Sequence, residues 1–177
     1  MYLLQDKYSD INDQEFPIMA ELKKKNKEQY FEAIHTAYLG ERIARKLDIN
    51  HKAVKGCCYY YKIANEKIQS DTKGLVPITE FYEFPQDLVS LIEECQKNSY
   101  HSKESCVVLT SNKIIRNIIK EQKRLQNKDI PYEDIISGIF REMIQSDVLD
   151  YCDISIKELN IMARTFIEEK LYYDFLR

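Results

Sequence analysis

The most informative segment of the chain reads Ala33-Ile34-His35-Thr36-Ala37-Tyr38-Leu39-Gly40-Glu41-Arg42-Ile43-Ala44 and continues through Leu47-Asp48-Ile49-Asn50 into Gly56-Cys57-Cys58-Tyr59-Tyr60-Tyr61-Lys62-Ile63-Ala64. Its apolar residues recur at steps of three to five, which predicts a helix over residues 27–47. Asn50 is a suitable N-cap for a second helix over residues 51–68, because its side chain can accept a hydrogen bond from an otherwise unpaired backbone amide. The segment therefore predicts two consecutive helices joined by a short turn.

Helical periodicity covers most of the remaining sequence. It predicts a helix over residues 13–26, a short one that begins at Pro85, and three more over residues 102–126, 131–145 and 155–175. The last helix opens with Ser155-Ile156-Lys157-Glu158, a capping-box pattern. Residues 69–84 contain Gly74, Pro77 and several Ser and Thr residues, and we expect a loop there. The fold class predicted is all-α, a bundle of about six to seven helices.

Composition agrees with this class and limits the function. With 177 residues, 44% hydrophobic and 31% charged, residues 1–177 are expected to form a single globular domain. Only four Gly and four Pro residues argue against a turn-rich β-sandwich or barrel. The formal net charge of −3 excludes a globally basic nucleic-acid-binding protein, although a local basic patch is compatible with it.

The five cysteines and the N-terminus bear on the cellular compartment. No Cys-x-x-Cys pair is present, so a structural zinc site is not predicted, and the cysteines are expected to be small buried residues in a reducing compartment. Residues 1–6 become charged before any apolar stretch develops, so we expect no secretory signal. No apolar run approaches the roughly 20 residues that span a bilayer. A cytoplasmic location is expected, without a membrane segment in this chain.

Several stretches, in order along the chain, resemble the soluble HD domain of a bacterial family, the seven-transmembrane HD proteins that hydrolyse cyclic di-AMP. His35 stands where that family has its lone first His. Gly56-Cys57-Cys58-Tyr59-Tyr60-Tyr61-Lys62-Ile63-Ala64-Asn65 aligns with the family pattern Tyr-Tyr-His-Asp-Ile-Gly-Lys. The segment from Phe84 to Glu94 resembles the Leu-Pro helix that ends in a His-His pair, and the segment from Leu149 to Leu159 is similar to the acidic turn and terminal helix. The resemblance implies an HD-domain-like helical bundle.

The sequence departs from the family at the positions that the resemblance assigns to metal ligands. The replacements are Tyr61 and Lys62 for the His-Asp pair, Cys95 and Gln96 for the His-His pair, and Ser111 and Asn112 near the last Asp. The expected loop over residues 69–84 is also too short for the family's intervening helix, which carries further His ligands. The ligand set around His35 is therefore almost entirely replaced.

These departures change the chemistry that the site can perform. An HD site uses imidazoles and carboxylates to hold divalent ions that polarise a phosphate and activate a water. A protonated Lys62 has no lone pair to give and repels a cation, and a Tyr with a pKa of about 10 is a poor ligand at neutral pH. We therefore expect no metal and no other cofactor. The favoured function is a catalytically degenerate HD domain, a pseudo-phosphohydrolase that acts as a binding, regulatory or assembly module.

The candidate ligand-binding residues of the remnant cleft are His35, Tyr61, Lys62, Ser111 and Asn112. The favoured interpretation of His35 is a satisfied, partly buried side chain, and the alternative is a donor to an anionic ligand in the old cleft. Lys62 is expected to pair with a carboxylate, and binding of a phosphate is the alternative. The candidate ligand is a nucleotide or another phosphate-containing anion. A protein partner or a homodimer is also compatible with the sequence.

Two other functions remain open. The chain could be an active metal-dependent HD phosphohydrolase or cyclic dinucleotide phosphodiesterase whose ligands stand in another register. It could also bind nucleic acid through the basic helix 113–124, which carries Lys113, Arg116, Lys120, Lys123 and Arg124. Nucleic acid is the less favoured partner, since Glu and Asp on neighbouring elements can balance such a stripe.

Overall fold

The computed structural model describes residues 6–126 and 128–176, so residues 1–5, on which the expectation about a secretory signal mainly rests, lie outside the described residues. The elements of the described part are α1 (Tyr8–Ile11), α2 (Pro17–Lys25), α3 (Lys27–Lys46), α4 (His51–Tyr60), β1 (Lys67–Ser70), β2 (Gly74–Pro77), α5 (Ile78–Phe81), α6 (Gln86–Gln96), α7 (Lys103–Arg124), α8 (Tyr132–Gln145), α9 (Val148–Tyr151), α10 (Ile156–Glu168) and α11 (Lys170–Asp174).

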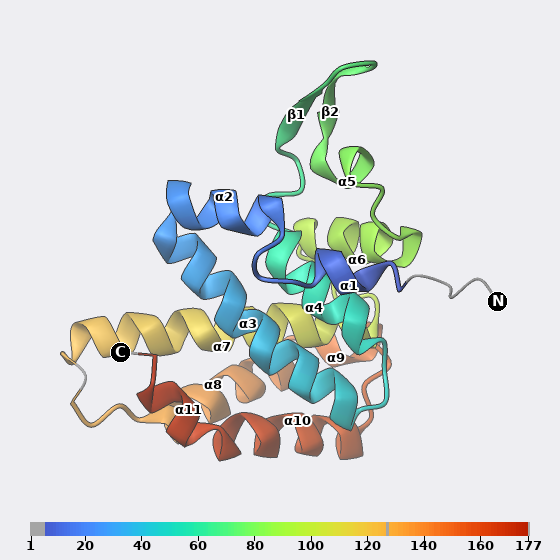
Figure 1. The fold of residues 1–177 in the computed structure, drawn as a ribbon. Coiled ribbons are helices and arrows are strands. Elements are labelled where there is room, and N and C mark those ends of the chain that lie inside the picture. The colour runs from blue at the N-terminus through green and yellow to red at the C-terminus, as the bar shows by residue number, and fades with distance from the viewer. Residues whose placement is uncertain (1–5, 127, 177) are drawn as a thin grey trace.

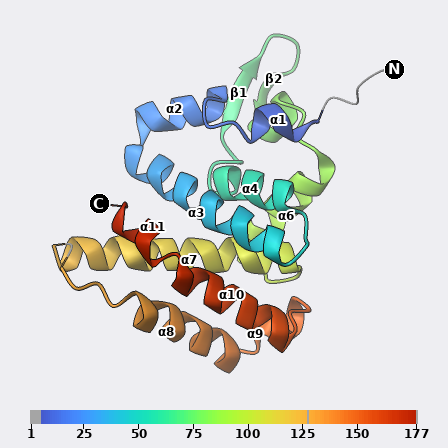
Figure 2. The same cartoon turned by 60° about the horizontal axis from the view of Figure 1, so that its bottom comes forward.

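Two long helices, α3 and α7, cross at the centre of the molecule and contact each other (Figure 1). On one side, α4 packs against both of them, α1 and α6 pack on α4, and α2 packs on α3. On the other side, α8 packs on α7 and α10 packs on α3 and α8, with α9 and α11 at the two ends of α10 (Figure 2). The arrangement is helical throughout except for β1 and β2, so the all-α HD-like prediction is confirmed.

The core lies where the central helices meet. Leu39 and Ile43 of α3 and Ile114 and Ile118 of α7 are fully buried, as the three- and four-residue spacing of apolar residues predicts. Gly40 lets α3 approach α4 closely, because a Cβ atom at this position would lie 3.0 Å from the Cys58 Sγ and 3.2 Å from the Val54 Cγ1. The α3–α4 pair is therefore packed too tightly to accept a larger residue at position 40 without a shift.

The predicted helix starts at Asn50 and Ser155 are confirmed. The Asn50 Oδ1 accepts a hydrogen bond from the backbone N–H of Ala53 at 3.1 Å. The Ser155 Oγ accepts from the backbone N–H of Glu158 at 3.2 Å, and the Glu158 carboxylate accepts from the backbone N–H of Ser155 at 2.8 Å. Each side chain satisfies a backbone amide that has no partner within its helix.

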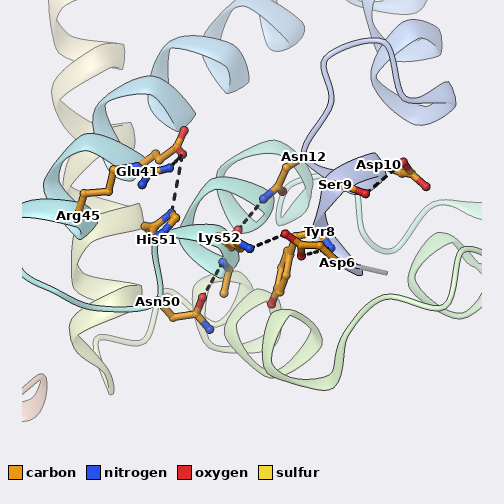
Figure 3. Close-up of polar contacts among 11 residues, drawn as sticks. Asp6, Tyr8, Ser9, Asp10, Asn12, Glu41, Arg45, Asn50, His51 and Lys52 are labelled. Carbon is orange, nitrogen blue, oxygen red and sulfur yellow. Dashed lines mark hydrogen bonds and ion pairs between the residues drawn. The ribbon is translucent and has the colours of Figure 1, made fainter. Parts of the chain in front are cut away.

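The N-terminal segment docks against the start of α4, the helix that Tyr61 and Lys62 directly follow. The Asn12 Nδ2 donates to the Lys52 backbone carbonyl at 2.9 Å, and Lys52 forms an ion pair with Asp6 (Figure 3). From the other side, Glu41 of α3 lies 3.8 Å from the His51 Nδ1 (Figure 3). These contacts link α1, α3 and α4 at one end of the molecule.

The sequence-based boundaries fail between residues 61 and 84. The prediction of a helix to residue 68 is wrong, because α4 ends at Tyr60 and residues 67–70 pair antiparallel with residues 74–77. Ile68 and Val76 are cross-strand partners, and Gly74 adopts a φ of 74°, which favours glycine. The prediction of a loop over residues 69–84 is also wrong in part, since this stretch contains β2 and α5. The hairpin projects from the helical body (Figure 1).

The C-terminal helix, predicted as continuous over residues 155–175, is divided at Glu169 into α10 and α11. The Glu169 carboxylate is buried, forms an ion pair with Arg42, and accepts a hydrogen bond from the Tyr38 hydroxyl at 3.1 Å. The break turns the last short helix toward α3, which brings Tyr172 against the α3 residues around His35.

The cysteines follow the sequence-based expectation in their burial. Cys57, Cys58, Cys95, Cys106 and Cys152 are all buried and free of disulfides. Within residues 6–126 and 128–176, no helix has the length and apolar character needed to cross a bilayer.

Candidate ligand-binding cavity

A cavity of about 570 Å³ lies among the end of α4, the end of α6 and one face of α7. Its lining contains four cationic residues: Lys62, Lys113, Arg116 and Lys120. The amide side chains are those of Asn98, Asn112 and Asn117, and the remaining lining residues are Tyr61, Cys95, Tyr100 and Leu109. In the described part of the chain no Asp or Glu lines this cavity, so its walls suit an anion better than a cation.

Lys62 closes one side of the cavity through a polar cluster with α3 and α7. Its ammonium group forms a hydrogen-bonded ion pair with the Glu32 carboxylate. The same carboxylate accepts a hydrogen bond from the Asn112 Nδ2 at 2.7 Å, and that amide lies 3.3 Å from the Thr36 Oγ1. The predicted pairing of Lys62 with a carboxylate is confirmed, and Glu32 is the partner that sequence reasoning did not identify.

Tyr61 lies beside Lys62 and is almost fully buried. Its ring centroid is 5.6 Å from the Lys62 Nζ, within the range of a cation–π contact. Burial raises the pKa of the Tyr61 hydroxyl well above its usual value, so the group stays protonated and is no metal ligand at neutral pH. The Gln96 side chain donates to the Tyr61 backbone carbonyl at 3.0 Å, which joins the ends of α4 and α6.

Ser111, the neighbour of Asn112, points elsewhere. It is fully buried, and a Cβ atom at Gly40 would lie 3.7 Å from its Oγ, so Ser111 faces the α3–α4 contact and does not line the cavity. Its Oγ has no hydrogen-bond partner within the described residues. Of the two residues proposed from the sequence for the last ligand position, Asn112 is the one that reaches the cavity.

His35 is separated from the other four candidates. Its Nδ1 forms a hydrogen bond with the Tyr172 hydroxyl, and its ring packs edge-on against Phe31 at a centroid distance of 4.1 Å. Burial lowers the pKa of His35 to about 4, so the imidazole is neutral at pH 7. The favoured prediction, a satisfied and partly buried His, is confirmed. The reason is helical geometry: Glu32 and Thr36, one turn apart, face α7, whereas His35 faces α11.

The basic helix contributes to the cavity in a way that sequence reasoning missed. Lys113 pairs with Glu142 at 2.8 Å and Lys123 with Glu28 at 3.0 Å, whereas Arg116 and Lys120 make no ion pair with any described residue. Leu109, Lys113, Arg116 and Lys120 follow one another at steps of three and four, and this spacing was the available signal that they share a face. The basic stripe of α7 is therefore partly a cavity wall.

Comparison with solved structures identifies the fold. The chain is similar to the HD domain of the phosphodiesterase PgpH from L. monocytogenes, with a TM-score of 0.65, 17% identity, and coverage of 88% of this chain and 99% of that one. The same domain in complex with cyclic-di-AMP matches with a TM-score of 0.63, 15% identity, and coverage of 88% and 97%. The chain has an HD-domain-like fold. No family model matches the sequence, and no curated protein matches it either.

The residues of this HD-like fold do not fit the divalent metal that HD phosphohydrolases use. Among the described residues no group of three or more His, Cys, Asp and Glu side chains is placed to hold a metal ion. At Lys62, which the resemblance aligns with the His-Asp pair, the ammonium group already forms an ion pair with the Glu32 carboxylate. A cation placed there would displace Lys62 and meet its positive charge.

Proposed function

We propose that this chain is a non-catalytic HD-like domain that binds a phosphate-containing ligand, with a nucleotide as the favoured class, in the cavity between α4, α6 and α7. Such a domain would act in regulation or assembly through the bound ligand. The proposal assigns the former metal-binding position to a protein cation, Lys62, and the binding energy to cation–phosphate contacts.

One observation carries the proposal: the cavity beside the Tyr61-Lys62 dipeptide is lined by four cations and, within the described residues, by no carboxylate. Of these cations, Lys62 and Lys113 are each balanced by one Glu, and Arg116 and Lys120 are left to attract an anion. The volume of about 570 Å³ falls in the range of small-molecule sites. The cyclic-di-AMP complex of the structurally similar PgpH domain supports a nucleotide as the class of ligand.

Phosphodiester cleavage by an HD site needs metal-bound water. Tyr61, Lys62, Gln96 and Asn112 supply no imidazole, carboxylate or thiol, and Cys95 belongs to no group of three or more potential ligands within the described residues. Lys62 and Asn112 are also held by Glu32, so they form a structural bridge between helices.

The test is a calorimetric titration with mononucleotides and cyclic-di-AMP, with and without a metal chelator, combined with metal analysis and a hydrolysis assay in Mn²⁺. We expect binding that the chelator does not change, no stoichiometric metal and no turnover. Lys62→Ala should weaken binding about tenfold, because it removes a cation and leaves the Glu32 charge beside the cavity.

Lys73→Ala is the matched control, since Lys73 also pairs with a glutamate, Glu80, but lies on the hairpin away from the cavity. It should leave the affinity unchanged. Stoichiometric bound metal together with turnover would contradict the proposal and support the alternative, an active metal-dependent phosphohydrolase.

A further inference from the structure

The cavity has two chemically different ends, both of which include residues outside the set predicted from the sequence. Arg116 and Lys120 lie at one end, one helical turn apart on α7. Tyr100 and Asn98, from the segment between α6 and α7, line it together with Leu109. A site for a simple anion needs only the cations Arg116 and Lys120. The aromatic, amide and apolar side chains at the other end indicate a ligand that has another part besides a phosphate.

The order of these residues along α7 sets the distance between the two ends. With a rise of about 1.5 Å per residue, the Cα atoms of Leu109 and Arg116 are roughly 10 Å apart along the helix axis, and those of Leu109 and Lys120 roughly 16 Å. The phosphate of a mononucleotide and the far edge of its base are separated by a comparable length. A ligand that contacts both ends is therefore an elongated molecule with one charged end.

The charged end is built for phosphate. Arg116 has a planar guanidinium that can donate two parallel hydrogen bonds to phosphate oxygens, and Lys120 adds a point charge. Neither Arg116 nor Lys120 forms an ion pair within the described residues. Lys113, which lines the same wall of the cavity, forms an ion pair with Glu142 at 2.8 Å. The unbalanced charge of the cavity is thus concentrated at the Arg116–Lys120 end.

The other end is built for a flat ring with polar edges. Tyr100 is partly buried, and burial raises the pKa of its hydroxyl to about 12, so it presents a neutral ring and a donor. Leu109 adds an apolar surface, and the Asn98 amide offers both a donor and acceptors. Stacking on an aromatic ring combined with an amide at the ring edge is a common way to hold a nucleobase.

From these two ends we infer that the cavity binds a nucleotide in one orientation, with its phosphate between Arg116 and Lys120 and its base against Tyr100, Leu109 and Asn98. This inference rests on the proposed function, and it adds the direction of the ligand and the residues that read each part. Tyr100 and Asn98 determine which base is bound, and Arg116 and Lys120 of α7 supply the affinity for the phosphate.

The experiment separates the ligand into its parts. AMP, adenosine, ribose 5-phosphate and inorganic phosphate are titrated into the full chain, with binding followed by ligand-observed NMR and calorimetry. AMP should bind more tightly than any of the other three. Arg116→Gln should weaken AMP and ribose 5-phosphate about tenfold and leave adenosine unchanged. Tyr100→Leu, and Asn98→Ala as a second variant at the same end, should weaken AMP and adenosine and leave ribose 5-phosphate unchanged.

Lys73→Gln is the matched control, because Lys73 is an exposed lysine on the hairpin and lines neither this cavity nor the adjoining one that Arg116 and Lys120 also line. It should change none of the four affinities, and thermal unfolding of each variant verifies that it is folded. If inorganic phosphate binds as tightly as AMP, or if Tyr100→Leu and Asn98→Ala leave AMP binding intact, the orientation is overturned while anion binding stands. If none of these probes and no cyclic-di-AMP binds, the proposed function falls as well.

Discussion

Two faces of the same helix, α3, carry polar side chains with opposite surroundings. On the face toward α7, Glu32 and Thr36 join Lys62 and Asn112 in a charged cluster beside an open cavity. On the face toward α11, His35 is enclosed by aromatic rings and bonded to the Tyr172 hydroxyl. His35, which stands where the family resemblance places a metal ligand, thus contacts only the aromatic side, and Glu32, which belongs to no motif, bonds two residues that line the cavity. The surroundings of Glu32 and His35 therefore depend on their positions around α3 more than on their residue types.

The largest effect on stability should come from removing the aromatic contacts between α3 and α11. Tyr172 stacks on Tyr38 at a centroid distance of 3.9 Å and bonds His35, so Tyr172→Ala removes both contacts. We expect a loss of about 2–3 kcal/mol in the free energy of unfolding, measured in urea, with ligand binding in the cavity unchanged. Phe175→Ala, at the residue that directly follows α11, is the control, because Phe175 is 84% exposed and its removal should change stability by less than about 0.5 kcal/mol.

A smaller effect is expected from the charged face, where the two charges are coupled. Lys62→Met and Glu32→Gln should each cost about 1 kcal/mol, and the double variant should cost less than the sum, since either single change leaves a charge without its partner. The exposed pair Lys73 and Glu80 supplies a parallel cycle, in which a coupling near zero is expected. If the two cycles gave equal coupling free energies, the Lys62–Glu32 pair would be no different from the exposed Lys73–Glu80 pair.

The smallest effect should be a change in the pH dependence of stability. His35 has its pKa lowered by burial from 6.5 to about 4, so the unfolded chain binds this proton more readily than the folded one. Its contribution is present above about pH 6.5 and is lost as the pH falls toward 4. His35→Gln should therefore flatten the decline in stability between pH 6.5 and pH 4.

The comparison for this pH effect is Phe175→Ala, which replaces an exposed side chain that carries no titratable group. That variant should keep the slope of the unmodified chain. The effect is modest because His35 is only partly buried and solvent screens the rest.

Local signals along the chain were sufficient to predict the helices but not all of their ends. Asn50 and Ser155 marked two helix starts correctly because capping depends on side chains within three residues. The predicted extension of α4 to residue 68 failed because α4 ends at Tyr60 and Lys67–Ser70 pair with Gly74–Pro77 in a hairpin, so the pairing context of these residues overrides their helical pattern. The break at Glu169 likewise depends on Arg42 and Tyr38, more than 120 residues earlier.

The candidate site was predictable in part for the same reason. Tyr61, Lys62 and Asn112, which the family resemblance proposed as ligand-binding residues, line one cavity. His35 and Ser111 do not line this cavity, because the position of a residue around its helix sets the direction of its side chain, and a shift of one residue rotates that direction by about 100°. Glu32 and Tyr100 belong to no motif, and their places at or beside the cavity depend on how α3, α6 and α7 pack together.

The contact between α3 and α7 also has a consequence for the order in which the chain assembles. The Glu32–Asn112 bond joins residues 80 apart and the His35–Tyr172 bond residues 137 apart, whereas α3 and α4 are neighbours along the chain. Closing such long loops costs chain entropy before any contact is gained, so the α3–α4 pair is expected to form early and both polar clusters late. Substitutions in the cavity would then change mainly the unfolding rate. The folding rate, which depends on the early α3–α4 contact, would stay nearly the same.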